Sequence, residues 1–329
     1  MLATDRQCRR AILLGAAVAI AAPALAQSPF AAVETLHGVG ASVPHRLYST
    51  WADRFGPDLG LDLNYVPLGS GAGRRAAVER QADFGGSDTN MDAADLAKAD
   101  LAQVPTASAA LGFVVNLPGI ATTRLRLRRA DMLGIFTGDI RTWSDPRLRA
   151  SNPDLDLPHL AITPILRREV SGSTSLAVAW LSGAGAGQEP GAGMLDRTPG
   201  LAVFGAHGVA LTVRRLRGSI GFLEASSARQ FGLDVLDIER ADGTFETLAQ
   251  SPEALERGEG SSLWPLVTRT NILIPRDASQ RRRSSMVARF FRTCLLEGDT
   301  LAASVGYLPL PDPIRSDAVR KLDMLFDGP

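Results

Sequence analysis

The sequence predicts an α/β protein built from two lobes. Its 329 residues exceed what one hydrophobic core usually holds, so two lobes are the default expectation. Strand-like and helix-like stretches alternate along the chain. The stretch "LDLNYVPL" at 61–68 alternates polar and apolar residues, and "AGRRAAVERQ" at 72–81 has a helical composition. This alternation is typical of helices packed on a mainly parallel sheet.

The first residues have the pattern of an export signal. Three arginines precede the apolar run "AILLGAAVAIAAPALA" at 11–26, which ends in an A-x-A-like pattern. We expect cleavage after Ala26 and a mature protein in the periplasm. The run is too short and too rich in alanine for a membrane span, and no later segment approaches the roughly 20 apolar residues that a spanning helix needs. Cleavage would leave Cys294 as the sole cysteine, so we expect no internal disulfide and a buried, inert thiol there.

Charge and motif patterns exclude several classes of function. The 35 basic and 35 acidic residues balance, which argues against a nucleic-acid surface. The four histidines are scattered without the spacing of a metal cluster. No stretch fits a dinucleotide fingerprint, a Walker loop or a nucleophile elbow. We therefore expect no catalytic residue, no metal and no cofactor, and any anion site must be local.

The first of three Ser/Gly-rich loops carries Ser42. It precedes a helix predicted to begin near Pro44, because apolar residues recur there at every fourth position and form one stripe. These residues are Leu47, Trp51 and Phe55.

Two further loops have the same composition and also precede helices. Ser70 stands in "PLGSGAG", and residues 171–174 precede a helix predicted to begin near Thr174. Each loop could simply cap its helix, since Ser, Thr and Gly are favoured at N-caps. If the loops converge, their amides and hydroxyls form a cup of donors that suits a tetrahedral oxyanion. Arg168 could add a bidentate fork to such a cup.

Asp88, in "DFGGSDTN", would let this cup distinguish between oxyanions. An ionised carboxylate accepts hydrogen bonds and donates none, so it repels sulfate. Phosphate near neutral pH still carries a proton and can donate it to Asp88. The alternative is that Asp88, Asn90 or Asp92 caps the helix "DAADLAKA".

The motifs together resemble one family, the periplasmic phosphate-binding proteins of phosphate ABC transporters. The stretches "GVGASVPHRLYSTWADRF", "LNYVPLGSGAG" and "DFGGSDTNM" are similar to consecutive family blocks. So are "VVNLPGI", "GIFTGDIRTWSDPRLRASNPDLDLP", "GSIGFLE" and "WPLVTRTNILI". The resemblance runs in order over nearly the whole mature chain.

The resemblance implies a set of phosphate ligands drawn from all the loops. They are Ser42, the amide of Val43, Ser70, Asp88, Arg168 and the loop 171–174.

Two features of the third loop depart from the family pattern. The family's Ser-Gly-Thr corresponds either to Gly172, Ser173 and Thr174 or, in a shifted register, to Ser171, Gly172 and Ser173. The family also has an acid two residues after its arginine, where this chain has Val170. Arg168 is then less well oriented, unless Glu169 substitutes.

The side chains next to the first loop also differ from the family. His45 and Arg46, where the family has small residues, would line the mouth of the cleft or lie on the surface.

The family fold implied is a type II-like periplasmic binding protein with two mixed sheets flanked by helices. Residues 27–106 plus 270–329 would form the first lobe and 107–269 the second, hinged by two extended crossings. Such a protein captures inorganic phosphate as a monomer, without covalent chemistry, and delivers it to an ABC permease driven by an ATPase. The alternatives are a receptor for arsenate or a sulfate-like oxyanion, a phosphate sensor or adhesive relative, and an exported phosphatase.

Overall fold

The computed structural model describes residues 33–183, 198–240, 242–248 and 264–326. The predicted signal peptide at 1–26 lies outside these residues. Across the described ranges, no helix has both the length and the apolar character needed to cross a membrane.

The described strands form an eight-stranded mixed sheet in the order β2-β1-β3-β10-β4-β7-β5-β6. One group of strands is β1 (Glu34–Gly40), β2 (Leu61–Pro67), β3 (Phe84–Ser87) and β10 (Val267–Pro275). The other is β5 (Thr163–Arg167), β6 (Leu201–Val203) and β7 (Ser219–Glu224). A separate ladder pairs β8 (Ile238–Glu239) with β9 (Phe245–Glu246).

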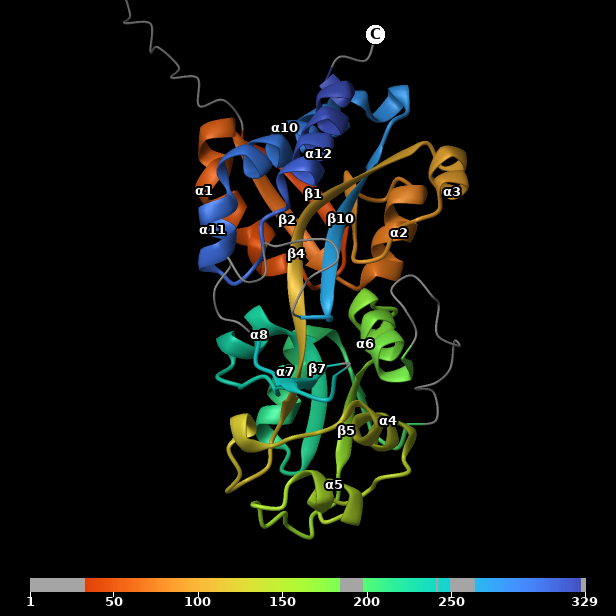
Figure 1. Cartoon of the computed structure of the whole chain (residues 1–329). Coiled ribbons are helices and arrows are strands. Elements are labelled where there is room, and N and C mark those ends of the chain that lie inside the picture. Colours follow the sequence, from red (N-terminus) through yellow and green to blue (C-terminus); the bar gives the residue numbers. More distant parts are fainter. Residues whose placement is uncertain (1–32, 184–197, 241, 249–263, 327–329) are drawn as a thin grey trace, which may run out of the picture. The chain divides into compact units, whose positions relative to one another are not determined.

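The long strand β4 (Leu101–Val115) joins the two groups. Its first part, to Ala110, pairs with β10, and its last part, from Leu111, pairs with β7. Figure 1 shows β4 and β10 side by side as they leave the first group. The two predicted sheets are therefore continuous through one shared strand.

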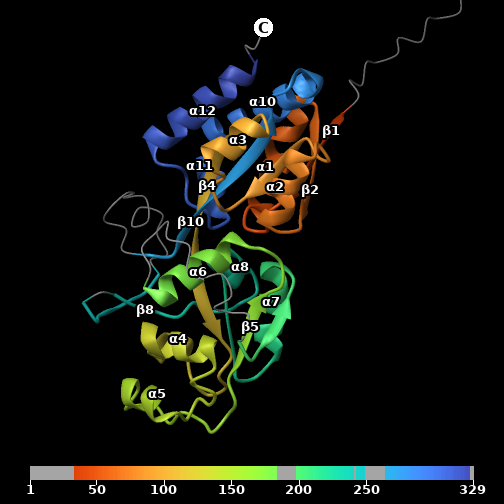
Figure 2. The ribbon, with the colours of Figure 1, turned by 90° about the vertical axis from the view of Figure 1, so that its right-hand side faces the viewer.

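Helices cover both groups of strands. The first group carries α1 (His45–Leu59), α2 (Ser70–Val78), α3 (Ala93–Lys98), α10 (Arg281–Glu297), α11 (Asp299–Ser304) and α12 (Asp312–Phe326). The second carries α4 (Arg129–Thr137), α5 (Pro146–Ser151), α6 (Gly172–Ser182), α7 (Gly205–Arg215) and α8 (Ala225–Gln230). Short 3₁₀ turns occupy Thr122–Arg124 and Ala278–Gln280. Figure 2 shows α4 and α6 on the same side of the second group.

Separate hydrophobic cores lie on the two groups. The first draws on residues from Leu36 to Ala109 and from Ile272 to Leu322. The largest core of the second runs from Ala110 to Leu266, and a smaller one lies beneath α7. We propose that these cores are those of the two predicted lobes, with the crossings at β4 and β10.

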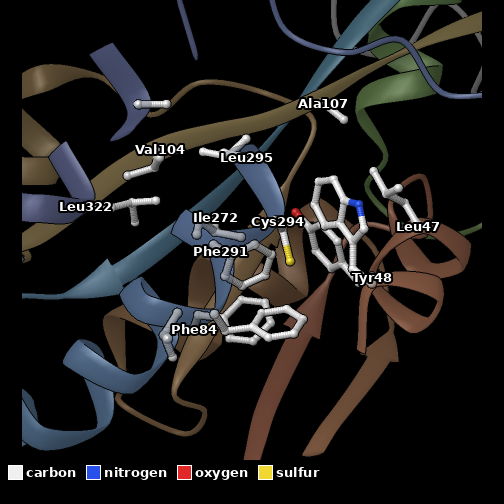
Figure 3. Close-up of a cluster of buried hydrophobic side chains, with 14 of the residues drawn as sticks. Leu47, Tyr48, Phe84, Val104, Ala107, Ile272, Phe291, Cys294, Leu295 and Leu322 are labelled. Atoms are coloured by element: carbon white, nitrogen blue, oxygen red, sulfur yellow. The ribbon is translucent and has the colours of Figure 1, made fainter. Parts of the chain in front are cut away.

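The stripe on α1 shows why this sequence packs as it does. Leu47, Trp51 and Phe55 are all buried in the first core, as the four-residue spacing predicts. Figure 3 shows Tyr48, Phe84 and Phe291 in the same core, with Cys294 among them. The predicted buried thiol is confirmed, and burial raises the pKa of Cys294.

Candidate functional site

Three loops of the first group meet because the strands that precede them run in parallel. β1 pairs in parallel with both β2 and β3, so the carboxyl ends of all three strands lie at one edge of the sheet. Ser42 follows β1, Ser70 begins α2, and Asp88 follows β3. The Asp88 amide donates to Ser70 Oγ at 3.1 Å, which brings the loop of Ser70 into direct contact with the loop of Asp88.

Glycines make this close approach possible. A Cβ on Gly73 would lie 2.1 Å from the Gly86 carbonyl oxygen, and one on Gly85 would lie 2.2 Å from the Gly73 oxygen. Both distances are far inside van der Waals contact, so α2 can rest on β3 only with glycine at these positions.

Two buried tyrosines fix the loop that carries Ser42 by hydrogen bonds to its backbone. Tyr65 donates to the Ala41 carbonyl at 2.7 Å, and Tyr307 donates to the Val43 carbonyl at 2.6 Å. The Val43 side chain is 2% exposed and lies in the first core. Only the backbone of Val43 is therefore available to a ligand.

Asp88 does not cap the helix that follows it. The residue before α3 is Asp92, and Asp88 is buried instead, with Oδ1 lacking a hydrogen-bond partner among the described residues. Burial and the nearby Glu224 carboxylate raise the pKa of Asp88 to about 8, although Thr270, Arg167 and Ser70 act in the opposite direction. The carboxyl group therefore holds a proton at neutral pH, where the sequence argument takes it as ionised.

The structure does not bring Arg168, the predicted fork, to these loops; it brings Arg167. The Arg167 side chain is 1% exposed, and its Nη2 donates to Ser42 Oγ at 2.6 Å. Arg168 is exposed and stacks over Phe204 at 5.3 Å. The two differ because successive residues at the end of β5 point to opposite sides of the strand.

The neighbouring acid is also one position earlier than expected. Arg167 Nε donates to Glu169 Oε1 at 2.6 Å, so the acid two residues after the buried arginine is present and Val170 is not its replacement. Glu169 also accepts from the Gly205 amide at the start of α7, which fixes its carboxylate. The spacing Arg-x-acid, counted from Arg167, was visible in the sequence and would have identified this arginine.

The third loop packs directly against Asp88. A Cβ on Gly172 would lie 2.5 Å from Asp88 Cβ, so glycine is required there. Ser173 is fully buried and donates to Glu224 Oε1 at 2.8 Å. Ser171 Oγ and Thr174 Oγ1 are buried and have no hydrogen-bond partner in the described part of the chain. All four predicted loop residues thus lie at the start of α6, and Gly172 packs against Asp88.

Glu224 is a residue that sequence reasoning missed. It ends β7, is fully buried, and lies 3.7 Å from Arg167 Nη1. It is the last letter of the motif "GSIGFLE", but nothing in its local sequence indicates that β7 delivers it to the cup.

Unpartnered buried polar atoms concentrate on these residues. Buried donors and acceptors are nearly always paired in folded proteins, so such a concentration fits a ligand with several hydrogen-bonding oxygens. The atoms are Asp88 Oδ1, Arg167 Nη1, Ser171 Oγ, Thr174 Oγ1, Glu224 Oε2 and Thr270 Oγ1. Within the described ranges, no group of three or more His, Cys, Asp or Glu residues could hold a metal ion.

A cavity of about 180 Å³ adjoins Ser42. His45 from α1 and His207 from α7 line it, with ring centroids 6.5 Å apart. Burial and the charge of His207 lower the pKa of His45. The cavity wall also includes Pro67 and Phe204.

Comparisons with known proteins identify the family. The PBP superfamily domain matches residues 25–267. The phosphate-binding protein PstS of Pasteurella multocida is 30% identical over 306 residues, covering 85% of this chain and 88% of its own. PstS of Haemophilus influenzae is 29% identical, covering 88% and 92%.

Solved structures share the fold at lower identity. A phosphate-binding protein from Stenotrophomonas maltophilia has a TM-score of 0.61 at 18% identity, covering 87% of this chain and 93% of its own. An ABC-type phosphate transport receptor from Vibrio cholerae has a TM-score of 0.54 at 18% identity, covering 84% and 100%. With the fold and the sequence relatives in agreement, the chain belongs to the PBP superfamily and, within it, to the PstS family of phosphate-binding proteins.

Proposed function

We propose that this protein is an exported receptor that captures inorganic phosphate in the cup and delivers it to an ABC permease. The observation that carries the proposal is the buried side chain of Arg167 beside Ser42. It joins a donor from the second group of strands to the loops of the first. The names of the PstS relatives support the same ligand.

The cup supplies donors on several sides of a tetrahedral anion. We assign phosphate oxygens to Arg167, to the hydroxyls of Ser42 and Ser70, and to the Val43 amide. The start of α6 contributes amides, hydroxyls and the positive end of the helix dipole. We assign the donor role to the hydroxyls of Ser171 and Thr174, which are unpartnered, and to the amides of Gly172, Ser173 and Thr174, since the Ser173 hydroxyl already donates to Glu224.

Asp88 supplies the acceptor. Its raised pKa means that Asp88 and phosphate together hold a shared proton near neutral pH. One carboxyl oxygen then faces one phosphate oxygen across an O–H···O bond, which is short and strong when charged. Sulfate brings no proton, so it can bind only while Asp88 keeps its own, and above about pH 8 it would face an ionised carboxylate with no proton between them.

No bond is made or broken in this account. Ser42 Oγ accepts from the Arg167 guanidinium, which cannot act as a base, so the hydroxyl is not activated as a nucleophile. We place the mature protein in the periplasm as a monomer that docks on the permease, which an ATPase drives.

Calorimetry tests the proposal. The chain from Gln27 onward is unfolded, dialysed free of carried-over anion, refolded, and titrated with phosphate and then sulfate at pH 9, where Asp88 without ligand is ionised. We expect saturable binding of one phosphate per chain and no heat from sulfate. Binding of neither anion, or equal binding of both, would contradict the proposal. A phosphatase assay on the same preparation, with and without divalent metal, should show no turnover.

A further inference from the structure

Thr270 is a residue of β10 to which the ligand assignment above gives no role. Its side chain is fully buried, and its Oγ1 has no hydrogen-bond partner among the described residues. Asp88 Oδ1 is buried and unpartnered in the same way. Because buried polar atoms are nearly always paired, two such atoms on neighbouring side chains require an explanation.

The backbone of β10 brings Thr270 to Asp88. The antiparallel pairing of β10 with β3 places Asn271 opposite Ser87. Thr268 Oγ1 donates to the Asp88 carbonyl at 3.4 Å, and Asn271 Nδ2 donates to the Ser87 carbonyl at 3.3 Å. The register of β10 against β4 shifts between Thr270 and Asn271, and such irregularities re-aim side chains beside functional sites. Residues on both sides of Thr270 therefore hold the segment that carries Asp88.

Tyr48 and Thr106 leave the hydroxyl proton of Thr270 uncommitted. Thr106 Oγ1 donates to the Thr270 carbonyl at 3.2 Å, which uses the single proton of that hydroxyl. Tyr48 must therefore supply the proton in its 2.8 Å bond with Thr106. The Thr270 hydroxyl then has two acceptors within reach, the Tyr48 oxygen and the Asp88 carboxyl group. An ionised carboxylate is the stronger acceptor of the two.

The charged groups that face Asp88 come from the second group of strands. Glu224 at the end of β7 opposes ionisation of Asp88, and Arg167 at the end of β5 favours it. Thr270 favours ionisation more strongly than Arg167 does. Two tyrosines on adjacent elements stay neutral, because burial raises the pKa of their hydroxyls; they are Tyr48 from α1 and Tyr65 from β2.

We propose that Thr270 is a positioning residue that sets specificity: its hydroxyl donates to Asp88 Oδ1 and leaves the other carboxyl oxygen to accept the proton of phosphate. This role rests on the proposed phosphate function. A donor at Oδ1 stabilises the ionised form, so Asp88 gives up its own proton at a lower pH than burial alone would allow. An anion that brings a proton can use the freed acceptor, and an anion without one cannot.

The first test is a titration of Asp88 in the ligand-free protein, followed by carbon-13 NMR of its carboxyl carbon. Thr270→Val removes the hydroxyl and keeps a side chain of similar size. We expect the pKa of Asp88 to be about one to two units higher in this variant than in wild type, because a donor to the ionised form is lost. An unchanged pKa would overturn the inference and leave Thr270 a structural role only.

Two further variants serve as controls. Thr268→Val makes the same change two residues earlier in β10, where the hydroxyl contacts the carbonyl of Asp88 and not its carboxyl group. It should leave the pKa of Asp88 within a few tenths of a unit of wild type, and a shift equal to that of Thr270→Val would overturn the inference. Thr270→Ser keeps the hydroxyl and should restore the wild-type titration.

Sulfate binding provides the functional readout. Sulfate binds only while Asp88 keeps its own proton, so the wild-type Kd for sulfate should rise about tenfold per pH unit above about pH 8. In Thr270→Val this rise should begin about one unit higher. With each protein normalised to its own Kd at pH 6.5, sulfate should bind the variant about five- to tenfold more tightly than wild type at pH 9.5. Competition with phosphate at constant ionic strength measures both Kd values, and identical pH profiles would contradict the role of Thr270.

A crystal structure of the wild-type phosphate complex guards against misfolding of the variants. Thr270 Oγ1 should lie within about 3.0 Å of Asp88 Oδ1. A separation beyond about 3.5 Å with phosphate in the cup would overturn the inference while the proposed function stands. Absence of phosphate binding by wild type at every pH would instead overturn the proposed function, and the NMR titration, which needs no ligand, would still report the contact between Thr270 and Asp88.

Discussion

Asp88 combines a functional position with a cost in stability. Its carboxyl group is buried without a partner for Oδ1, beside Glu224 and only partly compensated by Arg167. Groups held in such surroundings are typical of binding sites, where the ligand supplies the missing interaction.

We predict that Asp88→Asn stabilises the ligand-free protein at pH 8. Because the pKa of Asp88 is about 8 in the fold and 3.8 as an unperturbed group, the unfolded chain releases its proton first as pH rises. The contribution of Asp88 to the free energy of unfolding is therefore fully present below pH 3.8 and is lost as pH rises towards 8. Because asparagine has no proton to lose, Asp88→Asn should raise the free energy of unfolding at pH 8 by about 2–4 kcal/mol, measured by urea denaturation.

Asp83→Asn is the matched comparison of opposite sign. Burial raises the pKa of Asp83, but hydrogen bonds from Arg283 and the His37 amide outweigh burial and hold the pKa below its ordinary value. Its contribution is present above the unfolded pKa and lost as pH falls, so Asp83→Asn should destabilise at pH 8. Equal effects of the two substitutions would contradict the assignment of Asp88.

Gly172 joins the third loop to Asp88 without room for a side chain. We predict that Gly172→Ala weakens phosphate binding at least about tenfold, because its Cβ would lie 2.5 Å from Asp88 Cβ and must push the loop away. Gly208→Ala, within α7, meets Val203 only at an ordinary 3.4 Å. That control should bind phosphate normally and gain up to about 1 kcal/mol of stability. Calorimetric titration with phosphate measures the affinity of both variants, and equal affinities would contradict the role given to Gly172.

At the scale of elements, the starts of α1 and α7 bring two imidazoles to one cavity. His45 stacks on Tyr65, and His207 packs against Phe231. No acidic side chain forms an ion pair with either histidine in the part of the chain that the structure describes. Protonation of His45 is therefore opposed by burial and by His207.

We predict that the pair His45 and His207 lowers the free energy of unfolding in mild acid. Above pH 6.5 His45 is neutral in both the folded and the unfolded chain, and its titration has no effect on stability. As pH falls below 6.5, the unfolded chain takes the proton first, so folded stability decreases until the lowered pKa of His45 is reached. Since the residue is only half-buried, solvent screening limits the loss to about 0.5–1 kcal/mol.

The matched variant for this prediction is His207→Gln. It removes the opposing charge, so the decrease between pH 7.5 and 5.5 should become smaller when thermal unfolding is followed at each pH. A larger decrease in the variant would contradict the role given to the pair.

Local patterns in the sequence predicted elements better than they predicted side-chain directions. The stripe Leu47, Trp51 and Phe55 depends only on spacing, and all three residues are buried as expected. The helix expected near Thr174 begins at Gly172, since Ser and Gly serve equally as caps or first-turn residues.

Side-chain direction at the end of β5 needed more than local sequence. Whether Arg167 or Arg168 turns inward depends on where the strand ends and which face packs on the core. The role of Glu224 depends on β7 lying beside β5, which is tertiary information.

At the scale of the whole described fold, the cup draws on both groups of strands. Ser42, Ser70 and Asp88 come from one, and Arg167 with the start of α6 comes from the other. We propose that β4 and β10 act as the hinge between them, as extended crossings do in proteins that close around a ligand. Phosphate would then link the two groups at this site, beside the hydrogen bond from Arg167 to Ser42.

The most direct measurement is a phosphate titration of two matched variants, Arg167→Lys and Arg168→Lys. Each keeps its positive charge, so Glu169 and Glu224 remain compensated, but lysine cannot form the planar fork of arginine. We predict that Arg167→Lys loses about 2–3 kcal/mol, roughly 30- to 150-fold in Kd, and that Arg168→Lys stays within about twofold of wild type. Loss of binding in Arg168→Lys with Arg167→Lys unaffected would contradict the site described above.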